Sequence, residues 1–148
     1  MLKKTRQIKQ KLSSHHYTAD AAVVWCYDNR FWKSFRTLVE KEGLKHFDPI
    51  VVAGGAKSIA SPNKKAEREF LLKQIEISIK LHHTSRVILM NHVDCGAYGG
   101  SKTFGNDVER EFSTHEKELE AAKKLIKKKF PKVKVDIVFV NFTGIQFI

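Results

Sequence analysis

The sequence has 148 residues, of which 42% are apolar and 29% charged, and its formal net charge at pH 7 is +11. These values are typical of one globular domain with its own core, so we treat residues 1–148 as one domain. No apolar run approaches the roughly 20 residues of a membrane span. The basic N-terminal segment 1–19 lacks the apolar stretch of a secretory signal, so we expect a cytoplasmic protein.

The positive charge is concentrated in the N-terminal segment, in the pair Lys64–Lys65 and in the run KKLIKKKFPKVK at 123–134. Cations are favoured at the end of a helix by its dipole, which accounts for much of the last cluster. No aromatic stacking motif or DNA-reading signature accompanies the charge. We therefore do not predict a nucleic-acid partner, although a basic nucleic-acid-associated protein remains an alternative.

Strand and helix patterns alternate along the chain. Continuous apolar runs, typical of strands buried on both faces, occur at 21–26, 49–54, 86–91 and 135–140. Apolar residues at helical spacing predict three helices, at 31–43, at 63–83 and from about 106 to Pro131. Asn106 and Ser113 each begin a capping-box spacing, so the last helix has two candidate starts.

This order predicts an α/β fold, a single-domain parallel sheet flanked by helices on both faces. In such sheets, ligands bind beyond the carboxyl ends of the strands. A functional site is therefore expected at the carboxyl ends of the predicted strands.

The two cysteines and one histidine fall at predicted strand ends, at Cys26, His92 and Cys95. His-x-x-Cys on a tight turn lets an imidazole and a thiolate share a metal ion, and Cys26 on a neighbouring strand supplies a third ligand. Two cysteines and a histidine leave tetrahedral zinc with one open position, which is the catalytic arrangement. Each cysteine taken alone is more often a small core residue, and it is the joint occurrence of the three residues that favours a metal site.

Two charged residues follow the first strand at alternate positions. In an extended segment Cys26, Asp28 and Arg30 would point to one side. Arg30 could then grip Asp28 with a bidentate pair beside the metal, although a purely structural ion pair is the alternative. The small residues Gly54 and Gly55 would let the backbone approach a small substrate, or merely form a turn.

The remaining histidines carry less information. His46 is a candidate for proton shuttling. His82, His83 and His115 lie on helical patterns, and we assign them no chemistry.

The paired motif Cys26-x-Asp28-x-Arg30 and His92-x-x-Cys95-Gly96 resembles the signature of the β-class carbonic anhydrases, over roughly residues 20–147. The resemblance implies Cys26, His92 and Cys95 as zinc ligands, Asp28 and Arg30 as the catalytic dyad, and a pocket beside Gly54, Gly55 and Gly96. It also implies a parallel sheet and a homodimer or higher even oligomer.

By this resemblance, the expected reaction is the reversible hydration of carbon dioxide to bicarbonate. Asp28 could also leave Arg30 and become a fourth ligand in a resting state. Tyr27 and the pair Val51–Val52 differ from the family pattern. They motivate a second hypothesis, a non-enzymatic zinc-binding relative, beside hydrolysis of another small linear substrate.

Overall fold

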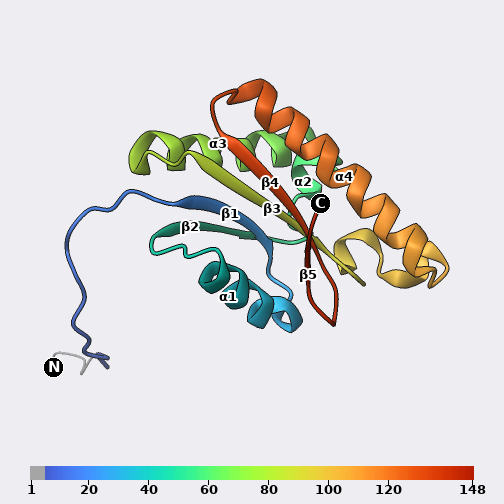
Figure 1. Ribbon diagram of the computed structural model, residues 1–148, viewed down its shortest axis with the longest axis horizontal. Helices are drawn as coiled ribbons and strands as arrows, with labels where there is room; N and C mark the ends of the chain where they lie inside the picture. The colour runs from blue at the N-terminus through green and yellow to red at the C-terminus, as the bar shows by residue number, and fades with distance from the viewer. Residues whose placement is uncertain (1–5) are drawn as a thin grey trace, which may run out of the picture.

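The computed structural model describes residues 6–148 and contains one five-stranded sheet with the order β2-β1-β3-β4-β5 (Figure 1). The strands are β1 (Ala21–Cys26), β2 (Phe47–Val52), β3 (Arg86–His92), β4 (Lys134–Val140) and β5 (Ile145–Phe147). The α-helices are α1 (Trp32–Lys41), α2 (Lys57–Ala60), α3 (Lys65–His82) and α4 (Val108–Lys129). Short 3₁₀ turns are η1 (Asn29–Phe31), η2 (Gly96–Tyr98) and η3 (Ser101–Phe104).

The predicted α/β class is confirmed, because β1 to β4 are mutually parallel and helices cover both faces. Alternate residues of each strand point to opposite faces. Thus Val24 packs into a core with residues of α3 and α4, whereas Val23 and Trp25 pack into a core with α1. Figure 1 shows the same division, with α3 and α4 on one side of the sheet and α1 on the other.

The end of β2 and the start of α4 differ from the sequence prediction. Strand β2 ends at Val52, before 54, because Gly54 and Gly55 adopt φ of 77° and 55° and turn the chain. Asp107, not Asn106 or Ser113, caps α4, and its carboxylate accepts hydrogen bonds from two backbone N–H groups of the first turn.

The fifth strand was not predicted. The Asn141 side chain accepts hydrogen bonds from the backbone of Thr143 and Gly144, which reverses the chain after β4. The three-residue β5 then pairs antiparallel with β4 at the edge of the sheet. A strand this short carries too little apolar periodicity to be recognised in a sequence.

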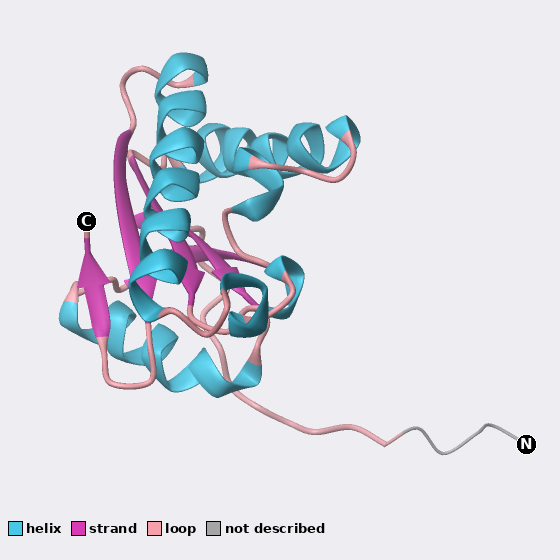
Figure 2. Cartoon of the chain, turned by 90° about the vertical axis from the view of Figure 1, so that its right-hand side faces the viewer, coloured by secondary structure: helices cyan, strands magenta, loops and turns pink. Residues whose placement is uncertain are grey.

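The basic N-terminal segment has no helix or strand over residues 6–19 and extends away from the rest of the molecule (Figure 2). The segment is attached to the domain near its C-terminal end through Tyr17, whose hydroxyl donates to Asp48 on β2 at 2.7 Å. Lys3 and Lys4 of the predicted segment lie outside the described residues. Within residues 6–148, no helix has the length and apolar character that crossing a bilayer requires.

A buried histidine gives the fold a pH dependence. His115 on α4 is fully buried, and burial lowers its pKa to about 4. The unfolded chain therefore binds a proton near pH 6.5 that the folded chain binds only near pH 4, so stability is lost as the pH falls through this window. The expected loss from this one group is about 3 kcal/mol between pH 6.5 and 4.

Chemical denaturation of the metal-free protein at several pH values checks this expectation. His115→Gln removes the titrating group, so its free energy of unfolding should depend less steeply on pH between 6.5 and 4. Equal slopes for the two proteins would show that His115 does not contribute to acid destabilisation.

Candidate metal centre

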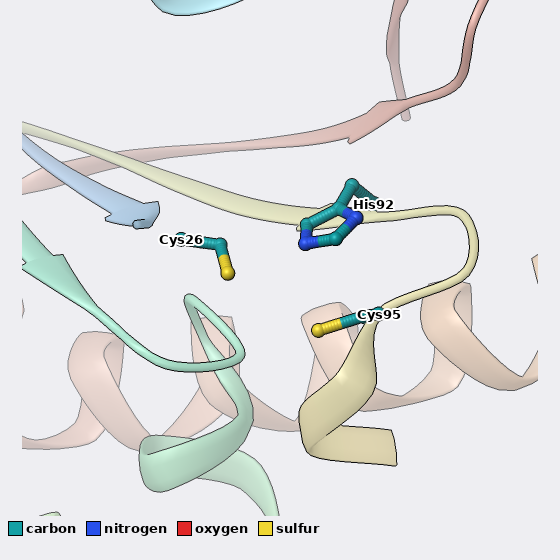
Figure 3. Close-up of side chains that lie close together, drawn as sticks. All are labelled: Cys26, His92 and Cys95. Carbon is teal, nitrogen blue, oxygen red and sulfur yellow. The ribbon is translucent and has the colours of Figure 1, made fainter. Parts of the chain in front are cut away.

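Three side chains that bind transition metals meet at the carboxyl end of the sheet (Figure 3). Cys26 is the last residue of β1, His92 is the last of β3, and Cys95 follows in the turn before η2. Because β1 and β3 are parallel neighbours, their ends bring Cys26 and His92 together. The candidate ligand atoms of all three residues lie within 4.8 Å of one another, and each residue is at most 3% exposed.

The imidazole of His92 has one nitrogen fixed and one available. Its Nδ1 lies 2.7 Å from the backbone carbonyl of Val93, and because a carbonyl only accepts, Nδ1 must carry the proton. Its Nε2 is then a lone-pair acceptor, buried and without a hydrogen-bond partner in the described part of the chain. A ring oriented through Nδ1 with a free Nε2 is the arrangement in which histidine binds metals.

The two thiols titrate as a pair. A hydrogen bond from Cys95, together with the backbone N–H groups of Asp28 and Gly54, lowers the pKa of Cys26. The Gly54 nitrogen lies 3.4 Å from the Cys26 sulfur. The same contact with Cys26 raises the pKa of Cys95. A divalent cation between the sulfurs would supply the positive charge that keeps both ionised.

This donor set fits a metal ion. The unpartnered His92 Nε2 would gain a bond, and two thiolates with one imidazole are ligands that zinc prefers. Three protein ligands leave one position of a tetrahedral ion for solvent or substrate. The cluster could therefore hold a metal ion in a catalytic arrangement.

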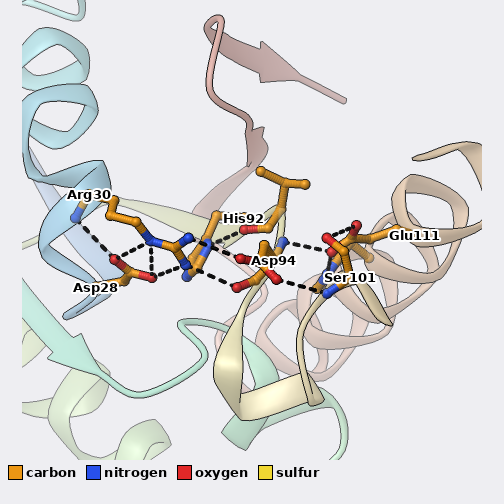
Figure 4. Close-up of polar contacts among 8 residues, drawn as sticks. Asp28, Arg30, His92, Asp94, Ser101 and Glu111 are labelled. Carbon is orange, nitrogen blue, oxygen red and sulfur yellow. Dashed lines mark hydrogen bonds and ion pairs between the residues drawn. The ribbon is translucent and has the colours of Figure 1, made fainter. Parts of the chain in front are cut away.

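Asp28 and Arg30 do form a close ion pair. The guanidinium donates from Nε and Nη2 to both carboxylate oxygens of Asp28, with the shortest distance 2.7 Å (Figure 4). Hydrogen bonds from Arg30 hold the pKa of Asp28 below its usual value. Asp28 thus stays ionised at neutral pH.

The pair forms for a different reason from the predicted alternation. Residues 29–31 are a 3₁₀ turn rather than an extended segment. Asp28 caps this turn by accepting a hydrogen bond from the Arg30 backbone N–H at 3.0 Å. Capping brings Arg30 back toward Asp28, so the two side chains meet although the strand has already ended.

The three predicted pocket glycines lie differently. Gly54 approaches the site closely, since a Cβ on it would lie 2.9 Å from the Cβ of Ala97. A Cβ on Gly55 would lie 2.1 Å from the carbonyl oxygen of Met90, so this glycine is required by packing against β3. A Cβ on Gly96 would meet no heavy atom within 4 Å, which leaves open space next to Cys95.

Two residues at the site were not assigned a role from the sequence. Asp94 accepts a hydrogen bond from Arg30 Nη1 at 3.0 Å, and Glu111 of α4 accepts the backbone N–H of Asp94 at 2.7 Å (Figure 4). Asp94 could have been noticed in the sequence, because it lies inside the His-x-x-Cys turn.

His46, the candidate for proton shuttling, lies elsewhere. It precedes β2 at the opposite, amino end of the strands, far from the metal cluster.

Comparison with protein families gives one match over most of the chain. A family model described as "Putative carbonic anhydrase" matches residues 17–146. A protein of Rickettsia bellii (strain RML369-C), named only as uncharacterized, is 29% identical, with 98% of this chain and 93% of that protein aligned.

Solved structures share the fold. Carbonic anhydrase from Streptococcus mutans superposes with a TM-score of 0.61 at 16% identity, covering 91% of this chain and 86% of that one. One of two tetrameric β-carbonic anhydrases from Sordaria macrospora gives a TM-score of 0.60 at 16% identity, with coverage of 90% and 82%. At this identity the likeness establishes the β-carbonic anhydrase fold.

Proposed function

The chain belongs to this carbonic anhydrase family, and we propose that it catalyses the reversible hydration of carbon dioxide to bicarbonate with zinc held by Cys26, His92 and Cys95. The observation that carries the proposal is the buried cluster in which His92 Nε2 lies with two thiols and has no hydrogen-bond partner among the residues that the structure describes. Zinc with one open position supplies a hydroxide nucleophile at neutral pH, because it lowers the pKa of bound water to about 7.

The ligands have distinct tasks in this proposal. His92 is fixed in one tautomer by Val93, so Nε2 is already oriented. The backbone N–H of Gly54 donates to Cys26 and moderates the charge on that thiolate. Thiolate ligands are retained where disulfides do not form, so we place the protein in a reducing compartment, the cytoplasm.

Asp28 orients the attacking group. An ionised carboxylate only accepts hydrogen bonds, so a protonated oxygen beside Asp28 must direct its hydrogen to the carboxylate and its lone pair elsewhere. Arg30 keeps the carboxylate charged and fixed through the bidentate pair. Gly54 and the open space at Gly96 leave room next to the ligands for a small linear substrate.

The experiment that tests the proposal is stopped-flow carbon dioxide hydration on protein of measured zinc content. We expect about one zinc per chain and a rate that rises between pH 6.5 and 9, the interval that brackets the titration of zinc-bound water. Zinc at one per chain with no hydration would exclude this function. In that case the same protein would be assayed with other small linear substrates. Hydrolysis of one of them would identify a different enzyme activity, and no hydrolysis would favour a non-enzymatic zinc-binding protein.

We also propose that the active form is a homodimer or a higher even oligomer. Near Arg30, Phe142 is 65% exposed and its ring stacks on Phe31 at 5.4 Å, while Tyr27 beside Cys26 is 68% exposed. Large exposed aromatic side chains at the margin of a site are typical of a surface that a second subunit covers. The tetrameric fold relatives from Sordaria macrospora support an even number.

Sedimentation velocity with simultaneous activity measurement checks the oligomer. The expected mass is an even multiple of 17.0 kDa. A fully active monomer would contradict the proposed assembly and leave the proposed reaction untouched.

A further inference from the structure

Arg30 is held on two sides. Its Nε and Nη2 donate to Asp28, while Nη1 donates to the Asp94 carboxylate at 3.0 Å and Nη2 also reaches the Asp94 backbone oxygen at 3.1 Å (Figure 4). A guanidinium is planar, so fixing one edge on Asp94 fixes the direction of the edge that faces Asp28. The orientation of Asp28 therefore depends on Asp94.

The turn that carries Asp94 is itself constrained. Asp94 has a φ of 54°, a left-handed conformation that few residues other than glycine adopt and that aspartate and asparagine tolerate best. Its Oδ1 accepts the backbone N–H of Ser101 at 2.9 Å, and its own N–H donates to Glu111 at 2.7 Å. The carboxylate of Asp94 thus uses one oxygen for the turn and the other for Arg30.

Glu111 fixes this turn from the opposite side. It is 2% exposed, and its second oxygen accepts the hydroxyl of Ser101 at 2.7 Å. It also lies in the first turn of α4, where the helix dipole favours a negative charge. A buried carboxylate with both oxygens engaged holds the Asp94 backbone and Ser101 in one fixed geometry.

We propose that Asp94 is a positioning residue, which holds Arg30 in place so that Asp28 stays beside the metal without binding it, and that Glu111 positions Asp94 in turn. The inference rests on the proposed function for its catalytic consequence. When the contact of Arg30 with Asp94 is lost, Arg30 no longer holds the Asp28 carboxylate in place, and Asp28 can leave Arg30 and take the open metal position. Catalysis then falls because the position for the reacting oxygen is filled.

The variant Asp94→Asn isolates the contact with Arg30. Asparagine also tolerates the left-handed backbone, so the turn is retained. The side chain of asparagine has only one acceptor oxygen, whereas the Ser101 N–H and the Arg30 guanidinium each need an acceptor. Its amide nitrogen is a donor, so it cannot accept from the remaining one of these two groups. The backbone carbonyl of Asp94 remains as the weaker anchor.

The readout that does not depend on turnover is anion binding to Co²⁺-substituted protein. Azide changes the visible cobalt spectrum when it enters an open metal position. With Asp28 competing for that position, the azide dissociation constant of Asp94→Asn should rise about 10- to 100-fold, the range that loss of an outer partner costs a metal site. Asp28→Asn combined with Asp94→Asn should restore azide binding, because the competing carboxylate is gone.

Variants of Glu111 test whether this residue positions Asp94. Glu111→Gln keeps an oxygen for the Asp94 N–H and should bind azide nearly as the unmodified protein does, whereas Glu111→Ala should resemble Asp94→Asn. If Glu111→Ala does not fold, Ser101→Ala removes one of the two hydrogen bonds that Glu111 accepts and should raise the azide dissociation constant by a smaller factor. The exposed Glu109 on the same helix provides the matched control, and Glu109→Gln should leave the azide dissociation constant and the cobalt spectrum unchanged.

The outcomes separate this inference from the proposed function. Unchanged azide binding and an unchanged cobalt spectrum in Asp94→Asn would overturn the positioning role, even if carbon dioxide hydration is fast. A protein that shows the azide effects but hydrates no carbon dioxide would keep the positioning role and lose the proposed reaction. If the azide dissociation constant rises in Asp94→Asn and the double variant does not reverse this rise, Asp28 is not the competing ligand, and the proposal is again overturned.

Discussion

Cys95→Ser is expected to lose bound zinc and, with it, all catalysed hydration. A serine hydroxyl is not ionised near neutral pH, so it cannot replace a thiolate as a ligand. Only Cys26 and His92 would remain, and two ligands do not hold zinc against solvent. Removal of an outer partner already lowers metal affinity by about 10- to 100-fold, so loss of a ligand should exceed about 100-fold.

Zinc content after dialysis and a competitive chelator titration measure the effect. His92→Gln should give the same result, since it removes the imidazole Nε2, which has no hydrogen-bond partner among residues 6–148 and lies within the cluster. His115→Gln serves as the matched control: this histidine is equally buried but lies outside the metal cluster, so zinc should remain at one per chain. Full zinc occupancy in Cys95→Ser would refute the ligand assignment.

The candidate ligands could be found from the sequence because parallel strands end at one edge of the sheet. Apolar runs located the ends of β1 and β3 closely enough to place Cys26 and His92 together. The ion pair of Asp28 with Arg30 was predicted for the wrong local reason, since a cap on a 3₁₀ turn produces it. Residue types at fixed spacing therefore identified the partners better than they identified the backbone between them.

The support behind the site could not be predicted in the same way. Glu111 is one acidic residue among several on α4, and acidic residues in a first helical turn are usually solvent-exposed. Its burial against the Asp94 N–H arises only when α4 packs beside the end of β3, a contact between segments distant in sequence. The same holds for the left-handed backbone of Asp94, which depends on Glu111 and Ser101 together.

Asp28→Asn is expected to retain zinc and lose about 100-fold or more of the hydration rate, within the range that a positioned proton acceptor contributes. Asparagine has the same shape, so the cap on the Arg30 N–H can persist through its oxygen. Its amide group, however, presents donors where Arg30 also presents donors, and it carries no charge. The acceptor that orients the attacking oxygen is then lost while the ligands are intact.

A second arginine–aspartate pair supplies the matched control for this change. Arg86 at the start of β3 donates to Asp136 on β4 at 2.6 Å, at the amino end of the strands and away from the metal cluster. Asp136→Asn breaks a pair of the same chemistry, so it should lower the free energy of unfolding and leave the hydration rate per zinc unchanged. An Asp28→Asn protein with full zinc and the unmodified rate would remove Asp28 from the reaction, and Arg30 with it, because Arg30 acts only through that carboxylate.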